Sequence, residues 1–529
     1  MRLAVRVGVC VVAFALFAFP ALAQKSGGIL KMYHRDNPPS ASILEEATNS
    51  TVIPFMGLFN NLVIYDQSKP QNSPDDIVPD LAKSWSWSAD GKDLTFKLQE
   101  GVKWHDGVPF TSKDVVCTMN LLTGKGEDKL RTNPRKTWYD NVQNVTTNGD
   151  YEVTLHLGRP QPSLLSLLAS GYSPIYPCHV PAAQMRTKPI GTGPFKFVDF
   201  KRNEGIKVAR NPDYWKKGKP YLDGIEFTIV PNRATAILAF TSGRFDIVFP
   251  WEVTIPLLKD VKQQMPNASC QVTSMNNSTN LLLNRDAPPF NDPDLRQALN
   301  LGIDRKAFVD IINQGDAQLG GVMQPPTDGV WGLPPEIFTK VPGYGPDVAA
   351  NREKARELMK KAGYGPDKHL KLKIATRGIS LYKDPAVILA GQLKEIWIDG
   401  DVDIIETAQW YPKIAKKNYE LGLNTTGNGV DDPDQNYFEN FSCKSERNYS
   451  GYCNPEIDKM IEQQSSMTDV AARKKLVWEI DQKLLEDNAR PIIMWNRAAT
   501  CMQPYVKGFV ANVNSVYNGF RFEDVWLDR

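Results

Sequence analysis

Residues 82–115 read AKSWSWSADGKDLTFKLQEGVKWHDGVPFTSKDV, with a tryptophan-containing run and a leucine-containing run separated by turn residues. Trp85 and Trp87 alternate with serines, which is the pattern of a strand with one buried face. An Ala-Asp-Gly-Lys turn precedes a second alternating run, and a further turn at His105 leads to a helix that begins near residues 111–112. The stretch therefore predicts a β-hairpin, a tight loop in which His105 packs structurally, and a helix start.

The same stretch resembles the signature region of the family 5 solute-binding proteins, the peptide- and nickel-type receptors of ABC importers. The shared motif is S-W-x-W-S-x-D-G-K-x-x-T-F-x-L-x-x-G-V-K-W-H-D-G-x-P-F-T-S-x-D-V. Two later segments also resemble the family, G-T-G-P-F from Gly191 and F-x-D-x-x-x-R-Q-A-L from Phe290. The resemblance implies an α/β, two-lobed periplasmic-binding-protein fold of type II with three domains, the first discontinuous, and a ligand held between the lobes.

The resemblance and the order of predicted elements suggest how the domains divide the chain. A predicted βαβ unit, with strands at 370–376 and 402–405 around a helix at 384–398, indicates a parallel pair with a right-handed crossover. We also expect one helical segment over residues 48–65. The expected domains are domain I of lobe 1 (24–61, 190–279 and 490–529), domain II, an extension of lobe 1 (62–189), and domain III, which forms lobe 2 (280–489).

Residues 1–23 have the pattern of a secretory signal peptide. Arg2 and Arg6 precede an apolar run that is too short to span a membrane, and Ala21-Leu22-Ala23 offers a small-x-small cleavage site. We therefore expect cleavage after Ala23 and a periplasmic mature protein.

The composition of the chain excludes some classes of partner. The 62 Lys+Arg and 60 Asp+Glu residues nearly cancel, and no basic block indicates nucleic acid or a membrane surface. The chain has only 5 His and lacks a G-x-S-x-G elbow, an H-E-x-x-H motif and a complete phosphate loop. We expect a monomeric binding protein without cofactor or metal, with ABC permease subunits as partners. A secreted hydrolase or a periplasmic sensor or chaperone using the same cleft stays open as an alternative.

Six cysteines follow the predicted signal peptide, and an exported chain can oxidise them. Cys443 and Cys453 flank a polar loop, which favours a disulfide between them, and the family resemblance supports this pairing. Cys117 is expected to be a small apolar residue on the buried face of its helix. Cys178, Cys270 and Cys501 cannot be paired from the sequence.

Two ligand-binding candidates follow the strands of the predicted βαβ unit. Arg377 follows the first strand, at the carboxyl end where open α/β sheets place ligands. The resemblance implies that Arg377 meets a peptide carboxylate, which a guanidinium group can hold with two hydrogen bonds, although a surface arginine fits the sequence equally well. Trp410 follows the second strand, and the resemblance implies that it walls the pocket, whereas the residue alone fits a domain core equally well.

The chain departs from the family at Asn428. Peptide receptors of the family have T-G-D-x-x-D/E-P here, and their aspartate pairs with the peptide ammonium group, whereas this chain has Asn428 after Thr-Gly and one extra residue before the proline. An amide accepts a hydrogen bond but supplies no charge. Either Asp431 or Asp432 replaces the missing carboxylate, or the ligand needs no free amine. The predicted ligand is a short peptide or another small carboxylate-bearing solute.

Two weaker candidates come from the ends of predicted strands in domain I. His34 ends the first strand, next to Arg35, where the family's cleft loop begins, and Trp251 follows a strand at residues 245–250.

Overall fold

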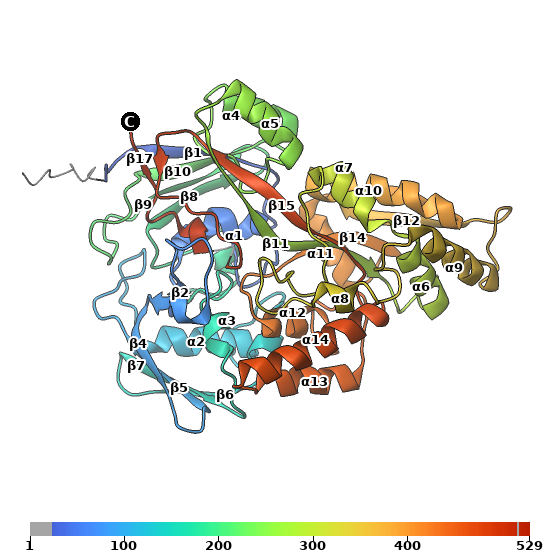
Figure 1. The fold of residues 1–529 in the computed structure, drawn as a ribbon. Coiled ribbons are helices and arrows are strands. Elements are labelled where there is room, and N and C mark those ends of the chain that lie inside the picture. Colours follow the sequence, from blue (N-terminus) through green and yellow to red (C-terminus); the bar gives the residue numbers. More distant parts are fainter. Residues whose placement is uncertain (1–23, 516–517) are drawn as a thin grey trace, which may run out of the picture.

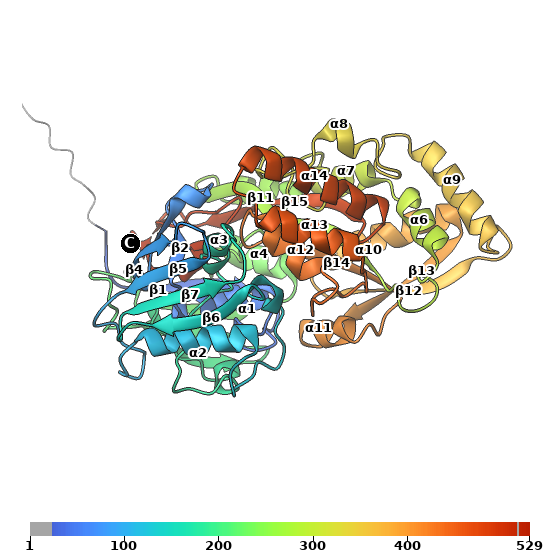
Figure 2. The same ribbon diagram turned by 90° about the horizontal axis from the view of Figure 1, so that it is seen from below.

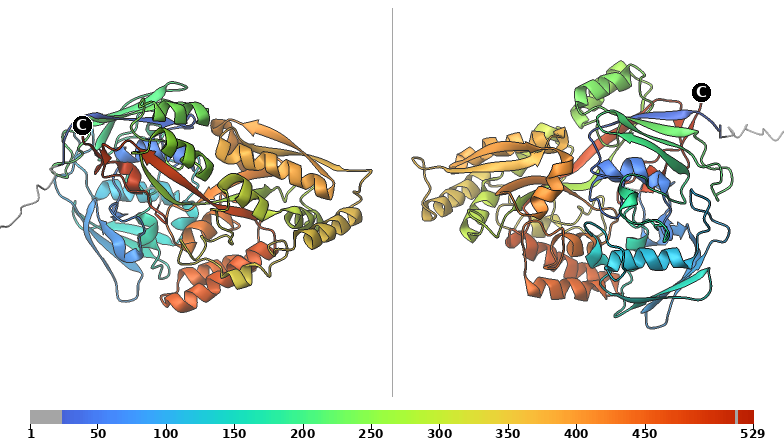
Figure 3. Two further views of the ribbon diagram at one scale, coloured as in Figure 1. Left: turned by 45° about the horizontal axis from the view of Figure 1, so that its top comes forward. Right: turned by 180° about the vertical axis from the view of Figure 1, so that it is seen from behind.

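The computed structural model describes residues 24–515 and 518–529, which form two lobes joined by a pair of long strands (Figure 1). Figures 2 and 3 show the same two masses from below, from an oblique angle and from behind. The predicted signal peptide over residues 1–23 lies outside the described residues. Among the residues that are described, no helix combines the length and the apolar character needed to cross a membrane.

Lobe 1 contains two four-stranded sheets. In the first sheet the order is β1-β10-β9-β8, with β1 parallel to β10 and the other pairs antiparallel. The second sheet is antiparallel with the order β4-β5-β7-β6. The strands are β1 (Ile29–His34), β4 (Ala82–Trp87), β5 (Asp93–Leu98), β6 (Val142–Thr147), β7 (Glu152–Leu157), β8 (Phe195–Lys201), β9 (Gly205–Arg210) and β10 (Gly224–Ile229).

The predicted hairpin is confirmed as β4 and β5, and helix α2 (Ser112–Thr123) follows it with Thr111 as its N-cap. His105 ties the loop before α2 to the turn before β8. Its Nδ1 accepts from the Gly191 N–H at 3.2 Å, and its Nε2 donates to the Gly193 carbonyl at 3.1 Å. Burial lowers the pKa of His105 to about 4, so the ring is neutral near pH 7. His105 therefore has the structural packing role that the sequence predicts.

A five-stranded sheet with the order β13-β12-β14-β11-β15 links the lobes. The predicted βαβ unit is confirmed, because β12 (Leu370–Arg377) runs parallel to β13 (Ile398–Ile405) with α10 between them in the chain. Strands β11 (Ser269–Leu283) and β15 (Ile492–Met502) are antiparallel and cross from one lobe to the other (Figure 1). Strand β14 (Leu421–Gly427) lies between β12 and β11.

Helices cover both lobes, and the apolar core of lobe 2 lies between its sheet and helices α6, α9 and α10. The remaining helices are α1 (Asn49–Phe55), α3 (Leu164–Leu168), α4 (Arg233–Thr241), α5 (Ile255–Gln264), α6 (Pro293–Gly302), α7 (Arg305–Asn313), α8 (Pro335–Phe338), α9 (Val348–Lys361), α10 (Ser380–Leu393), α11 (Thr407–Ala415), α12 (Pro433–Asn440), α13 (Pro455–Ser465) and α14 (Val470–Glu486).

The helical segment expected over residues 48–65 is wrong in its second half. Helix α1 ends at Phe55, a 3₁₀ turn follows, and residues 63–65 form β2, which pairs with β3 (Ile77–Pro79). The chain turns where the Asp80 carboxylate accepts from the Asn61 N–H and the Asn60 side chain at 2.9 and 3.0 Å. This long-range anchor overrides the helical pattern of the apolar residues.

The expectation for Cys117 is also wrong. Cys117 is bonded to Cys178. Helix α2 packs against the segment that ends at Cys178, and the Cys178 N–H donates to Oδ1 of Asp114 in this helix at 2.8 Å. A second disulfide joins Cys270 to Cys501, which face each other on β11 and β15. The predicted bond between Cys443 and Cys453 is present.

Gly191 lies in the turn before β8 and provides a test of the close packing between that turn and the segment after α1. A Cβ atom added at Gly191 would lie 1.8 Å from the Leu58 carbonyl oxygen, which belongs to backbone and cannot rotate away. Gly191→Ala is therefore expected to lower the free energy of unfolding by at least about 2 kcal/mol in chemical denaturation. The control is Gly391→Ala in α10, where a Cβ would meet nothing within 4 Å. Helix propensity makes that change neutral or stabilising by up to about 1 kcal/mol, and equal effects of the two substitutions would contradict the packing described.

Candidate functional site

A narrow cavity of about 20 Å³ lies between the lobes, room for about one water molecule. Its walls come from the segment after β1, from Tyr172, from β11 and β14, and from the helices and loops of lobe 2. The lining residues include two arginines and three tyrosines. No lining residue of this cavity carries a carboxylate. The lining residues are Arg35, Ala47, Thr48, Asn49, Tyr172, Asn277, Leu381, Tyr382, Tyr411, Thr425, Gly427 and Arg447.

Arg35 approaches the cavity from lobe 1. Its Nη1 lies 3.0 Å from Glu252 Oε1, and its guanidinium carbon lies 4.8 Å from the centre of the Phe249 ring. Glu252 is shared, because Arg233 Nε lies 3.2 Å from its other oxygen. One buried carboxylate therefore serves two guanidinium groups.

Arg447 approaches the cavity from lobe 2 and has the same arrangement. Its Nη1 donates to Glu439 Oε2 at 2.5 Å, while Arg135 Nε lies 3.4 Å from the other oxygen of Glu439. Arg135, from lobe 1, also stacks over the Tyr172 ring at 3.6 Å. Burial alone would lower the pKa of Arg447, but Glu439 and nearby tyrosines outweigh it, so Arg447 is charged. Glu439 again serves two guanidinium groups, one from each lobe.

Arg377 is the last residue of β12, and its side chain is fully buried at the boundary between the lobes. Its Nε donates to Thr407 at 3.0 Å and its Nη1 donates to the Tyr382 hydroxyl at 2.8 Å. Its Nη2 lies 3.0 Å from Oδ2 of Asp36, a residue of lobe 1. A ligand carboxylate could therefore bind Arg377 only by displacing Asp36, so Arg377 as a ligand anchor stays a prediction.

Asp36 is ionised, as its pairing with Arg377 requires. Burial alone would raise the pKa of Asp36, but Arg377, with smaller contributions from His34 and Arg35, holds it below its ordinary value. Asp36 also accepts from the hydroxyl groups of Ser50 and Thr407. The pair is thus an ionised, hydrogen-bonded contact between the two lobes.

Trp410 does not line the cavity; its neighbour Tyr411 does. Both residues lie in α11, where consecutive side chains point about 100° apart. Trp410 is fully buried in an apolar cluster with Leu282 and Ile414. Tyr411 donates to the Ala47 carbonyl of lobe 1 at 3.1 Å. The aromatic wall therefore comes from the next residue along the helix.

Asn428 follows Gly427 at the end of β14, and its backbone N–H donates to the Asn276 carbonyl at 2.9 Å. Its side-chain Oδ1 is buried without a hydrogen-bond partner in the described part of the chain. Asp431 and Asp432 lie elsewhere. Asp431 accepts from the Val330 N–H at 2.9 Å, and Asp432 is the N-cap of α12, paired with Arg473 at 2.8 Å. Neither carboxylate lines the cavity.

The two weaker candidates are buried supports. The ring nitrogens of His34 face the carbonyl oxygens of Asp36 and Ser50, which fixes the turn that carries Arg35 and Asp36. Trp251 packs edge-on against Phe520 at 5.4 Å and donates to Thr273 at 3.1 Å. Neither side chain is part of the cavity wall.

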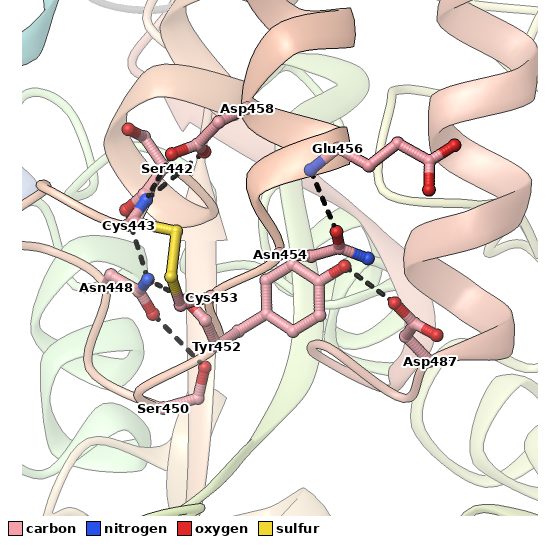
Figure 4. Close-up of a disulfide and its surroundings, with 10 residues drawn as sticks. All are labelled: Ser442, Cys443, Asn448, Ser450, Tyr452, Cys453, Asn454, Glu456, Asp458 and Asp487. Carbon is pink, nitrogen blue, oxygen red and sulfur yellow. Dashed lines mark hydrogen bonds between the residues drawn. A yellow bond between two sulfur atoms is a disulfide. The ribbon is translucent and has the colours of Figure 1, made fainter.

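The disulfide between Cys443 and Cys453 closes the loop that carries Arg447 (Figure 4). Within the loop Asn448 donates to the carbonyls of Ser442 and Tyr452. The loop is anchored outward where the Tyr452 hydroxyl donates to Asp487 at 2.7 Å (Figure 4). The sequence predicted the disulfide, but nothing in the pattern indicated that the closed loop presents Arg447 to the cavity.

In residues 24–515 and 518–529 no three His, Cys, Asp or Glu side chains are grouped so that they could hold a metal ion. A cavity bordered by both lobes of an α/β protein, with strands crossing between them, defines a two-lobed binding protein. The family model of the "Bacterial extracellular solute-binding proteins, family 5 Middle" matches residues 76–448. The chain belongs to this family of solute-binding proteins, as its signature stretch predicts.

Known relatives and structures match along most of the chain. The "Probable di/tripeptide-binding protein 5" of Pseudomonas aeruginosa (strain UCBPP-PA14) is 27% identical over 521 residues, which cover 90% of this chain and 92% of that protein. The periplasmic binding protein DppA of Helicobacter pylori in complex with peptide STSA has a TM-score of 0.82 at 22% identity, covering 96% and 99% of the two chains. AgaA from A. tumefacien R10 in complex with agropinic acid has a TM-score of 0.79 at 23% identity, covering 95% and 99%.

Removing the disulfide around Arg447 tests its role. The double variant Cys443→Ser/Cys453→Ser frees a loop with a sequence separation of 10 and is expected to lower the free energy of unfolding by about 2–3 kcal/mol. It should also weaken ligand binding severalfold in titration calorimetry, because Arg447 loses its constraint.

The control is Cys117→Ser/Cys178→Ser, which opens a disulfide with a sequence separation of 61 that does not border the cavity. The longer loop makes its expected cost about 4 kcal/mol, with affinity unchanged. Equal losses of affinity in both double variants would show that the closed loop has no specific role in binding.

Proposed function

We propose that this chain is the solute receptor of an ABC importer, and that it captures a short peptide or another small carboxylate-bearing organic solute between its lobes for delivery to a membrane permease. One observation carries the ligand class: each arginine that lines the cavity shares its carboxylate with a second arginine, and no carboxylate lines the cavity.

The charge balance favours an anionic ligand. Two guanidinium groups around one carboxylate leave an excess positive charge in a place where burial makes an unpaired charge costly. The Arg35 pair is partly relieved, because Arg233 also lies 3.8 Å from the exposed Asp384. The pair of Arg447 and Arg135 has no second carboxylate within salt-bridge distance in the described residues. A ligand carboxylate completes this set with charge-assisted hydrogen bonds.

The ligand needs no free amine under this proposal. Asn428 carries no charge and does not line the cavity, and both nearby aspartates are engaged away from the cavity. The names of relatives include di- and tripeptides, while one structural neighbour holds agropinic acid. A carboxylate-bearing solute is the chemistry that this cavity supports, and a peptide is one member of that class.

Arg377 has a different part in this proposal. Its pairing with Asp36 joins the lobes, so a movement that opens the lobes would separate the two groups. The pair then stabilises the closed, liganded form that the permease would recognise by its differential affinity. Direct contact between Arg377 and a ligand carboxylate is the competing role, and the two roles predict opposite effects for Asp36.

The proposal also includes the division of the chain into domains, the location of the mature protein and its oligomeric state. Domain I comprises residues 24–61, 190–279 and 490–529, domain II residues 62–189 and domain III residues 280–489. The signal peptide is removed after Ala23, the mature protein is periplasmic, and it acts as a monomer without enzymatic activity.

Asp36→Asn distinguishes the two roles of Arg377. If Asp36 and Arg377 stabilise closure, losing the Asp36 charge leaves a buried guanidinium group unpaired and should weaken ligand binding at least tenfold in titration calorimetry. If Arg377 instead binds the ligand carboxylate, the same substitution frees it and should strengthen binding. Asp384→Asn is the matched control, since Asp384 is half exposed and 3.8 Å from Arg233, and a change of less than about threefold is expected.

A thermal-shift screen tests the proposed ligand class. Short peptides, the same peptides with acetylated amino termini, organic acids and metal complexes would be compared, because a bound ligand raises the melting temperature by mass action. Carboxylates without a free amine are expected to stabilise the protein. Stabilisation by amine-bearing peptides alone would contradict the interpretation of Asn428, and recovery of a cleaved ligand by mass spectrometry would indicate a hydrolase instead of a receptor.

A further inference from the structure

A second cavity, which we call the chamber, adjoins the narrow cavity between the lobes. Its volume is about 660 Å³, and it shares Ala47, Tyr411 and Arg447 with the first cavity. The chamber lies between the segments after β1 and α2 on one side and helix α11 with the disulfide-closed loop on the other. Its lining residues are Pro39, Glu45, Glu46, Ala47, Arg131, Thr132, Pro134, Ala408, Tyr411, Pro412, Ala415, Lys416, Glu446, Arg447 and Tyr449.

The two cavities differ in volume. The narrow cavity has room for about one water molecule, so it holds no more than the end of an organic solute as it stands. The chamber falls within the range of about 300–1,000 Å³ that is typical of pockets for organic ligands. A solute whose end reaches the narrow cavity can therefore extend its body into the chamber.

Two of the three acidic side chains of the chamber, Glu45 and Glu46, are paired with arginines, whereas the third, Glu446, is exposed and accepts from the Asn133 N–H at 2.7 Å. Glu45 receives two hydrogen bonds from Arg186, at 2.7 and 2.8 Å. Glu46 accepts from Arg131 and from Ser40, each at 2.6 Å. Glu46 is buried, and Glu45 is buried as well. Glu45 and Glu46 therefore support the wall and leave little charge for a ligand cation.

The rest of the wall is mainly apolar or aromatic. Pro39 and Pro134 contribute from lobe 1, and Ala408, Pro412 and Ala415 contribute successive positions along one side of α11. Tyr411 and Tyr449 add aromatic surface. A wall of this kind binds hydrocarbon by removing it from water and offers few directional polar contacts.

Arg447 stands where the two cavities meet. Its Nε is buried and has no hydrogen-bond partner in the described residues, and its carboxylate partner Glu439 is shared with Arg135. Arg490 adds a further charge nearby: burial, with Arg447 next in effect, lowers the pKa of Arg490 to about 10, which leaves it protonated at neutral pH. An anionic group at the junction would satisfy this excess charge.

We propose that the chamber is a subsite for the apolar body of the ligand, whose carboxylate is held by Arg447 at the junction of the two cavities. The ligand class is then an elongated organic acid with an apolar chain or ring, and an N-acylated peptide is one example. This inference rests on the proposed function, because it assigns the chamber to the same captured solute.

The test uses acetate, hexanoate and decanoate, which share a carboxylate and differ only in apolar length. Titration calorimetry with the mature protein should show affinity rising with chain length, by up to about fourfold for each buried methylene. Decanoate should therefore bind at least tenfold more tightly than hexanoate. Equal affinities for the three acids would overturn the chamber as a subsite.

Ala415→Trp fills the chamber from an exposed position at the end of α11, so the fold should tolerate it. It should weaken decanoate binding at least tenfold and leave acetate binding unchanged. Ala471→Trp, at an exposed position of α14 that does not line the chamber, is the matched control and should change neither affinity. An unchanged affinity of Ala415→Trp for decanoate would also overturn the proposal.

Arg447→Lys keeps the positive charge and removes the planar fork, so it should weaken all three acids by a similar factor and preserve the dependence on chain length. Unchanged affinity for every acid would exclude Arg447 as the carboxylate partner. The two proposals fail in different ways: if no carboxylate of any length binds, the proposed function fails, whereas binding without dependence on length removes the chamber alone.

Discussion

A buried guanidinium group needs a negative partner, and this requirement organises the boundary between the two lobes. Asp36 satisfies Arg377, while Glu252 and Glu439 are each divided between two arginines. The first arrangement is balanced and holds the lobes together. The other two leave positive charge beside a cavity. We propose that closure and ligand selection both depend on the cost of leaving a buried charge unpaired: the paired charge of Arg377 favours the closed lobes, and the incompletely paired arginines favour an anionic ligand.

The fold places these groups by means of its long crossing strands and its closed loop. Strands β11 and β15 carry the chain between the lobes, so β14 and its Gly427 end at the cavity next to the lobe-1 segment after β1. The disulfide-closed loop supplies Arg447, and α11 supplies Tyr411. Arg35 and Arg447, which are some four hundred positions apart in the sequence, thus line the same small cavity.

The sequence predicted the scaffold better than the site. The hairpin at 82–115, the βαβ unit and one disulfide could be predicted because their signals are local: alternation, turn residues and a polar loop between two cysteines. The pairing of Arg377 with Asp36 could not, because the partner lies in another lobe. Trp410 and Tyr411 are adjacent letters, and only the rotation of α11 shows which one faces the cavity. No sequence pattern indicated Arg447, because its place in the charge balance of the cavity depends on sharing Glu439 with Arg135.

We propose that excess positive charge between the lobes selects an anionic solute. The most direct measurement compares decanoate with its neutral primary amide, two ligands of nearly the same shape, in calorimetric titrations of the mature protein. We expect the acid to bind at least tenfold more tightly than the amide, because only the carboxylate offsets the charge shared around Glu439. Equal affinity for the two compounds would contradict this proposal.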